Sequence, residues 1–172
     1  MAGFTLIESA PDDSLTTVEV KAAHGQDVAV GDIVSLIGEI SPHANPYVAH
    51  TVSGAGNPIF GVVIAIDWET ATDTNKSYLP AGTAGTLKVV TDGLFSCEAD
   101  AAVLVTNFGQ NLAVNVTVPA AGRSQMTLNV ASAGAASDQM RLVGCESASK
   151  LAAGDKLYVR INESQVKQEA GV

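Results

Sequence analysis

VAVGDIVSLIGE, residues 28–39, decides the fold because it sets a tight turn directly in front of a strand. Gly31 supplies the turn, since glycine reaches backbone conformations that other residues avoid, and the carboxylate of Asp32 can cap that turn. Successive side chains after the turn face opposite sides of an extended strand. The stretch therefore predicts a chain that turns a corner and starts a core strand.

Nearly the same phrase returns in LAAGDKLYVRIN, residues 151–162. Gly154 and Asp155 repeat the turn, and KLYVRIN repeats the strand. Two such starts, one early and one final, suit a barrel or sandwich in which the last strand returns to pair near the first ones. Asp32 and Asp155 are therefore interpreted as turn caps and not as catalytic acids.

Strand patterns fill most of the remaining chain. PIFGVVIAID, residues 58–67, is a continuous apolar run, typical of a strand buried on both faces. Turn-forming clusters such as SGAGNP and PAGTAG separate the runs at the spacing expected of an all-β fold. The alternating runs are LTTVEVKA, DIVSLIG, TLKVVTD, LAVNVTV, MTLNVAS, MRLVGCE and KLYVRIN.

GTLKVVTDGLF, residues 85–95, predicts two strands hinged at Asp92 and Gly93, because Asp-Gly between two β-runs is a hairpin signal. The one candidate helix is short and lies within residues 98–103, although Val103 also fits a strand.

Composition bounds the function. The chain has 172 residues and a net charge of −9, from 18 acidic and 9 basic side chains, and the basic ones are scattered singly. Direct binding to nucleic acid is not expected, because such affinity rests on grouped Lys and Arg. Gly, Asp or Asn interrupts every apolar run before it could span a bilayer, and the N-terminus lacks the pattern of a signal peptide. We expect a soluble, intracellular protein in which Cys97 and Cys145 are buried thiols.

The order of phrases AVGDIVSL, IFGVVIAI, GTLKVVTDGLFSCEADAAV and LAAGDKLYVRIN resembles that of the capsid decoration, or head cement, proteins of tailed bacteriophages. The resemblance covers residues 28–102 and 151–162. It implies a small β-barrel protein without cofactor or enzymatic activity. The implied protein is made in the host cytoplasm and binds the major capsid protein on the outer surface of the virion as a homotrimer.

The resemblance also suggests how the chain is divided. Residues 17–162 are expected to form a single β-barrel-like domain, which the length of the chain also favours, and residues 104–148 are expected to insert two or three strands beyond the family pattern. Residues 163–172 form a C-terminal tail. The overall expectation is an all-β barrel or sandwich with an extra-strand insertion and an extended N-terminal arm.

Residues 1–16 are expected to form that arm. Phe4, Leu6 and Ile7 are apolar, and a turn-forming break at Pro11 separates them from the first confident strand. An extended arm can add a strand to the sheet edge of another protein, here the capsid, or it can pair within its own subunit. In the first case the arm is poorly ordered in the isolated protein, and its deletion leaves the melting temperature nearly unchanged.

The sequence offers few candidates for catalytic or metal-binding residues. The sequence holds no Walker loop and no G-x-S-x-G nucleophile elbow, so we expect no enzyme. Two groups could hold a metal, but exposed histidines and a solvated loop flank are the preferred interpretations, with Trp68 as a surface contact. These groups are His24, His43 and His50, and the acids Asp67, Glu69 and Asp73 around Trp68.

An alternative function comes from the aromatic residues. Trp68, Tyr78 and Tyr47 could serve as stacking platforms in a small-ligand or carbohydrate-binding β-module. Of these three, only Trp68 sits beside carboxylates in the sequence, and aromatic residues make up 5% of the chain.

Overall fold

The structure is a computed structural model that describes residues 3–9, 15–51, 57–67, 78–117, 125–134 and 139–162. Within these residues the chain forms strands and two single-turn 3₁₀ helices, with no α-helix, so the predicted all-β class is confirmed. The first strands are β1 (Thr5–Ser9), β2 (Leu15–Val20), β3 (Val28–Ala29), β4 (Ile33–Ile40), β5 (Pro46–His50), β6 (Gly61–Asp67), β7 (Tyr78–Leu79) and β8 (Gly85–Val90). They are followed by β9 (Gly93–Glu98), η1 (Val105–Asn107), β10 (Asn111–Thr117), β11 (Gln125–Asn129), η2 (Val130–Ser132), β12 (Met140–Cys145) and β13 (Lys156–Ile161).

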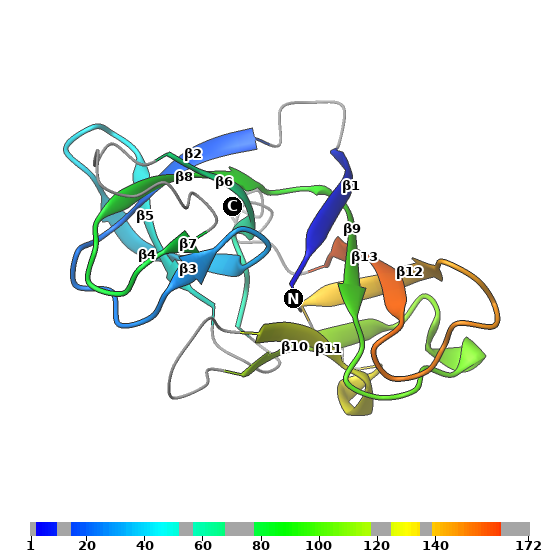
Figure 1. Cartoon of the computed structure of the whole chain (residues 1–172). Coiled ribbons are helices and arrows are strands. Elements are labelled where there is room, and N and C mark those ends of the chain that lie inside the picture. Colours follow the sequence, from blue (N-terminus) through cyan, green and yellow to red (C-terminus); the bar gives the residue numbers. More distant parts are fainter. Residues whose placement is uncertain are drawn as a thin grey trace.

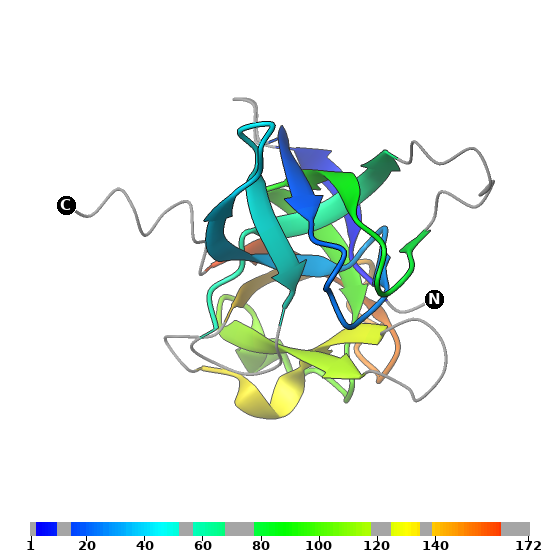
Figure 2. The same ribbon diagram turned by 90° about the vertical axis from the view of Figure 1, so that its left-hand side faces the viewer.

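Five strands close into a ring in the order β2-β5-β4-β6-β8 (Figure 1). The ring is antiparallel except where β2 meets β5, which pair in parallel at Glu19 and Tyr47. Strands β3 and β7 form a separate two-stranded ribbon. In Figure 2, which faces the ring, β10 and β11 cross the lower half of the molecule beneath it.

The other half is a six-stranded sheet in the order β1-β9-β13-β12-β10-β11. A bridge between Ala99 and Leu128 brings β11 back beside the end of β9, so this sheet curls around a core of its own. Three of its strands, β10, β11 and β12, lie in residues 104–148, the segment predicted to add strands. The last strand, β13, pairs with β9 and β12, and β9 alone separates it from β1 in the sheet.

The ring and the sheet share a wall. Strands β4, β6 and β8 each carry two adjacent buried residues, and the two side chains of each pair enter different cores. One core fills the ring, and the other lies between the ring and the sheet. This explains the apolar run at the start of β6, because both of its faces are buried at Val62 and Val63. The pairs are Ile33 and Val34, Val62 and Val63, and Val89 and Val90.

The first Gly-Asp phrase forms a tight turn before β4. The backbone N–H of Asp32 donates to the carbonyl of Ala29 at 3.1 Å, and Gly31 has a φ of +93° at the third position of the turn. The carboxylate of Asp32 accepts the backbone N–H of Ala29 at 2.8 Å. A four-residue turn with a positive φ at its third position favours glycine there.

The second phrase repeats this geometry before β13. Asp155 N–H donates to the carbonyl of Ala152 at 3.1 Å, and the Asp155 carboxylate accepts the Ala152 N–H at 2.8 Å. Gly154 has a φ of +82°. The two turns differ in their surroundings: a Cβ at Gly31 would lie 2.9 Å from the backbone oxygen of Phe4, whereas a Cβ at Gly154 would meet nothing within 4 Å.

The hairpin predicted at Asp92 and Gly93 is wrong. Strand β8 pairs with β2 and β6, whereas β9 pairs with β1 and β13, so the chain passes here from the ring to the sheet. Gly93 has no positive φ; it is needed because a Cβ there would come within 2.7 Å of the carbonyl oxygen of Glu8. Asp-Gly therefore marks the transition between two cores and not a hairpin turn.

The helix predicted within residues 98–103 is also wrong. Glu98 ends β9, and Ala99 makes the bridge to β11. Val103 is buried in the core beneath the sheet, and its backbone N–H donates to the carbonyl of Leu151 at 2.8 Å. The backbone groups of this stretch thus bond to distant segments, which overrides the local helical tendency.

The predicted free arm is corrected for residues 3–9. Strand β1 pairs with β9 of its own subunit, which is the second of the two outcomes considered above. Phe4 is only 3% exposed, and its backbone N–H donates to the carbonyl of Gly31 at 2.8 Å, so Phe4 is a core residue and not a capsid contact. Leu6 packs against the same core, while Ile7 sits at a bulge and is 48% exposed.

This packing predicts unequal losses of stability for two apolar residues of the N-terminal segment. Phe4→Ala should lower the free energy of unfolding by about 3 kcal/mol, because it empties a filled core position. Ile7→Ala should change it by less than about 0.5 kcal/mol, since that side chain is largely in solvent. Urea unfolding of both variants measures the difference, and similar values for the two would show that β1 is not packed as described.

The two Gly-Asp turns provide a matched pair of variants. Gly154→Ala should cost about 1 kcal/mol, the strain of alanine at a positive φ. Gly31→Ala should cost at least about 2 kcal/mol, because it adds a collision with the Phe4 backbone that can be relieved only by moving β1. Urea unfolding compares them directly; equal losses would mean that the N-terminal segment does not dock on the first turn.

Candidate functional site

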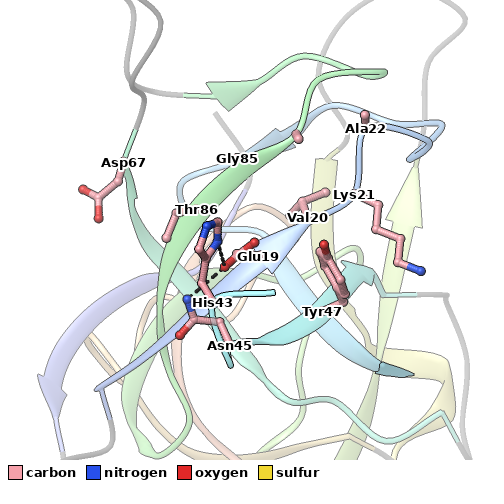
Figure 3. Close-up of a pocket in the computed structure, with 11 residues that line it drawn as sticks. Glu19, Val20, Lys21, Ala22, His43, Asn45, Tyr47, Asp67, Gly85 and Thr86 are labelled. Carbon is pink, nitrogen blue, oxygen red and sulfur yellow. Dashed lines mark hydrogen bonds and ion pairs between the residues drawn. The ribbon is translucent and has the colours of Figure 1, made fainter. Parts of the chain in front are cut away.

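An open pocket of about 760 Å³ lies at the rim of the ring, where the ends of β2, β5 and β8 meet (Figure 3). Its lining combines carboxylate, imidazole, amide and phenol groups with small residues at the start of β8 and just before it. The residues that line it are Glu19, Val20, Lys21, Ala22, His43, Asn45, Tyr47, Asp67, Ala84, Gly85 and Thr86.

Glu19 is the centre of the polar network beside this pocket. Its Oε1 accepts a hydrogen bond from Ser41 Oγ at 2.7 Å. The same oxygen accepts one from Asn45 Nδ2 at 2.9 Å, and His43 Nδ1 lies 3.1 Å away (Figure 3). All three partners belong to the turn between β4 and β5. The carboxylate therefore fastens that turn to β2.

The turn has a backbone conformation that needs such support. Ser41 Oγ accepts the backbone N–H groups of His43 and Asn45, each at 3.2 Å, and Ser41 N–H donates to the carbonyl of Asn45 at 2.8 Å. Ala44 takes a φ of +63°, which is strained for a residue with a Cβ. Ser41 thus links the strained turn to the carboxylate of Glu19.

This environment shifts the ionisation of Glu19. Burial raises the pKa of the carboxyl group, but the hydrogen bonds from Asn45, Ser41 and His43 favour the charged form and lower the pKa below its usual value overall. The side chain is 12% exposed, so these bonds are shielded from competing water. Glu19 is therefore ionised down to a lower pH than an ordinary glutamate, and its carboxylate holds the β4–β5 turn.

A second contact holds the same hairpin. Lys21 follows β2 and forms an ion pair with Glu39 of β4. Its ammonium group also lies 5.1 Å from the ring centroid of Tyr47 on β5, within range of a cation–π contact. Lys21 and Glu19 together fix both strands of the β4–β5 hairpin to the end of β2.

The hairpin so fixed presents apolar side chains to solvent. The last four residues of β4 are all exposed, including Ile37 and Ile40, and Ile40 is 73% exposed. Strands β4 and β5 pair as Leu36 with Val48 and as Ile40 with Pro46, so β4 bulges between these pairs and turns its end away from the core. We call Ile37, Glu39 and Ile40 the hairpin tip.

The three histidines do not gather. His24 lies within hydrogen-bond distance of backbone oxygens of Gln26 and Thr83, and His43 contacts Glu19. His50 was expected to be exposed, but its side chain is buried and its Nε2 lies 3.4 Å from Oδ2 of Asp32. The pairing of β4 with β5 places His50 opposite Val34, two residues after Asp32. Among the described residues no group of three or more His, Cys, Asp or Glu side chains could hold a metal ion.

The predicted aromatic platforms are not brought together. Tyr47 lines the pocket, whereas Tyr78 lies in β7, opposite Ala29, and is not part of the pocket lining. Asp67 lines the pocket at the end of β6, while Trp68, Glu69 and Asp73 lie outside the described residues.

The cysteines flank one residue of β13. Leu157 pairs with Cys97 on β9 and with Cys145 on β12, so the two thiols stand two strands apart, beyond the reach of a disulfide. Cys97 is buried, whereas Cys145 is partly exposed. Burial, with a smaller effect of Glu98, raises the pKa of the Cys97 thiol well above its usual value, which keeps it protonated and unreactive.

Sequence reasoning missed Glu19 and the hairpin tip. A signal was present in SPHAN, residues 41–45, a turn cluster that follows a strand ending in Ile40. Nothing in the sequence links this turn to Glu19, because the contact spans the parallel pairing of β2 with β5, two strands separated by the whole of β4.

Comparisons with models of known protein families, with curated proteins and with solved structures found no match to this chain. No helix in the described part of the chain is long and apolar enough to cross a membrane.

The lowered pKa of Glu19 predicts a pH dependence. Since the folded value lies below the unfolded one, the ionised carboxylate stabilises the fold above the unfolded pKa, and this stability is lost as the pH falls through the folded value. Glu19→Gln should cost about 1–2 kcal/mol at pH 7, and its difference from the wild type should shrink below a pH of about 4.

Urea unfolding of both proteins between pH 3 and pH 7 measures that difference. Glu146→Gln is the control, because Glu146 is exposed and pairs with Lys150 four residues along the chain. A gap between wild type and Glu19→Gln that stays constant over this range would contradict the assigned role of the Glu19 carboxylate.

Proposed function

We propose that this protein is a capsid decoration protein, which binds the outer surface of a tailed-phage head and stabilises the lattice of the major capsid protein. The observation that carries the proposal is the hairpin tip. A network around Glu19 and Lys21 holds the tip in place, yet its isoleucines remain in solvent. The resemblance of the strand and turn order to head cement proteins supports the same function.

The energetics of the tip favour a docking role. Exposed isoleucines contribute little to folding, whereas burying apolar surface against a partner yields about 25 cal/mol for each Å² removed from water. The strained backbone at Ala44 is a cost, and the hydrogen bonds of the Glu19 carboxylate offset it and keep the tip in one conformation. A preorganised contact loses less conformational entropy on binding than a mobile one.

In this proposal the protein acts in the virion, as a homotrimer whose subunits each contact the capsid. A decoration protein has to reach more than one capsid subunit, either through several copies or through several surfaces of one copy. Trimers at local three-fold positions meet that need, because closed symmetry places three identical tips on one lattice site.

Two measurements test the proposal. Mass spectrometry of tailed-phage particles from a culture that carries this gene should find the protein at a copy number commensurate with the capsid lattice. Purified protein should rebind to particles that lack it, and Ile37→Ser with Ile40→Ser should weaken this binding at least tenfold through the loss of buried apolar area.

The matched control is Leu104→Ser with Val105→Ser, which removes two exposed apolar side chains from the loop around η1 instead. This variant should bind as the wild type does. Absence of the protein from the particles, or equal binding by the tip variant, would overturn the assignment.

The pocket favours a second candidate, a small-ligand or carbohydrate-binding module. Tyr47 and Asn45 line one pocket with the carboxylate of Glu19, a combination of an aromatic face and polar groups that suits a sugar. A glycan-binding screen of the purified protein separates the two candidates. Binding that Tyr47→Ala abolishes, in a protein that does not attach to particles, would favour the module.

A further inference from the structure

Two arginines face each other across neighbouring strands of the six-stranded sheet. Arg141 of β12 and Arg160 of β13 are direct cross-strand partners, and both are exposed. Directly opposed side chains start about 5 Å apart at their Cβ atoms. Like charges in this arrangement repel each other and destabilise the sheet, so the pairing is not explained by folding.

Neither arginine has an ion-pair or hydrogen-bond partner within the described residues. In the register of the sheet, Asn111 stands beside Arg141, and Leu94 stands beside Arg160. The nearest acid in that row is Glu8, which lies beyond Leu94 and two strands from Arg160. This is notable in a chain with 18 acidic side chains against 9 basic ones.

Two exposed or partly exposed apolar side chains, Tyr158 and Val143, lie next to the two arginines. Tyr158 is on the same face of β13 as Arg160, two residues earlier, and its ring lies over Gly144 of β12. A Cβ at position 144 would come within 3.2 Å of Tyr158 Cδ2, so glycine lets the ring lie against the sheet. Val143, the extra residue of the bulge in β12, is exposed beside it. We call Arg141, Val143, Tyr158 and Arg160 the paired-arginine face.

We propose that the paired-arginine face binds a carboxylate-bearing segment of the major capsid protein, an inference that rests on the proposed function. A guanidinium group offers a planar fork of donors that matches a carboxylate, and two adjacent forks can engage one or two acidic side chains. A carboxylate placed between them removes their mutual repulsion, which adds to the attraction. The tyrosine ring and the valine supply apolar contact around this polar centre.

The surroundings favour an acidic protein segment over nucleic acid. The patch has two unpaired cations in a chain of net charge −9, and a phosphate backbone would be repelled by the rest of the surface. The third basic residue on this face of β13, Lys156, stands opposite the acid Glu98 of β9, so this pair of residues adds no net charge to the face.

The position of the face fits a bridging protein. Strands β12 and β13 lie on the opposite side of the molecule from the β4–β5 hairpin (Figure 1). The hairpin tip and the paired-arginine face can therefore contact different capsid subunits at the same time. One copy of the protein would then join two neighbours, which a single docking surface could not do.

The test measures binding of purified protein to phage particles that lack it, over a range of NaCl concentrations. The double variant Arg141→Gln with Arg160→Gln should bind at least tenfold more weakly, and its binding should depend less on salt than that of the wild type. Lys150→Gln is the charge control, because Lys150 lies in an exposed loop and pairs with Glu146. It should bind within twofold of the wild type.

Stability separates a binding defect from a folding defect. Removal of the repulsion should leave the urea midpoint of the double variant unchanged or slightly higher, so that weak binding cannot be attributed to unfolding. Binding equal to that of the wild type, with the same salt dependence, would overturn the inference while leaving the proposed function intact. Failure of the wild type itself to bind particles would overturn both.

Light scattering distinguishes the other occupant of the face, a second copy of this chain. The wild type would then self-associate, the association would weaken with salt, and the double variant would lose it while still binding particles as the wild type does. That result would assign the face to contacts between copies and overturn the capsid assignment. Self-association that is the same in both proteins, with weaker particle binding by the double variant, supports it.

Discussion

The shared wall of β4, β6 and β8 is the constraint on which the rest of the structure depends. Adjacent residues of one strand point to opposite faces, so a strand that separates two cores must be apolar at successive positions. Val62 and Val63 meet that demand in β6, and Ile33 and Val34 meet it in β4. A slip of one residue would exchange the two cores, each filled by side chains of different shape, and the register of the wall is therefore fixed by both at once.

The N-terminal strand completes the second core. Phe4 fills a position beneath the sheet, and its backbone lies so close to the turn before β4 that only glycine fits at position 31. The same closeness recurs where β1 passes Gly93. Two glycines that look like ordinary turn residues in the sequence thus serve different purposes. Gly31 needs both its positive φ and the space, whereas Gly93 needs only the space.

Local patterns predicted the local structure well. Alternation identified most strands, the apolar run of β6 indicated burial on both faces, and the two Gly-Asp phrases indicated turns that start strands. Strand pairings and side-chain contacts between segments far apart in the sequence could not be predicted. Asp92-Gly93 joins two sheets instead of forming a hairpin, because the choice between pairing β8 with β9 and pairing each with distant strands depends on total burial. The role of Glu19 was hidden for the same reason, since its partners in residues 41–45 become neighbours only once the ring has closed.

The hairpin tip and the paired-arginine face share a physical property: neither helps the chain to fold. Isoleucines in solvent lack the burial that stabilises the isoleucines of the core. Opposed arginines repel each other and so raise the free energy of the sheet that carries them. Serine at the tip and an acid at one arginine would give a fold of equal or greater stability. Both features would become favourable in the proposed complex, in which a partner covers the tip and neutralises the arginines. Since the shared wall packs the ring against the sheet, the fold sets the distance between the two surfaces, as the proposed joining of neighbouring capsid subunits would require.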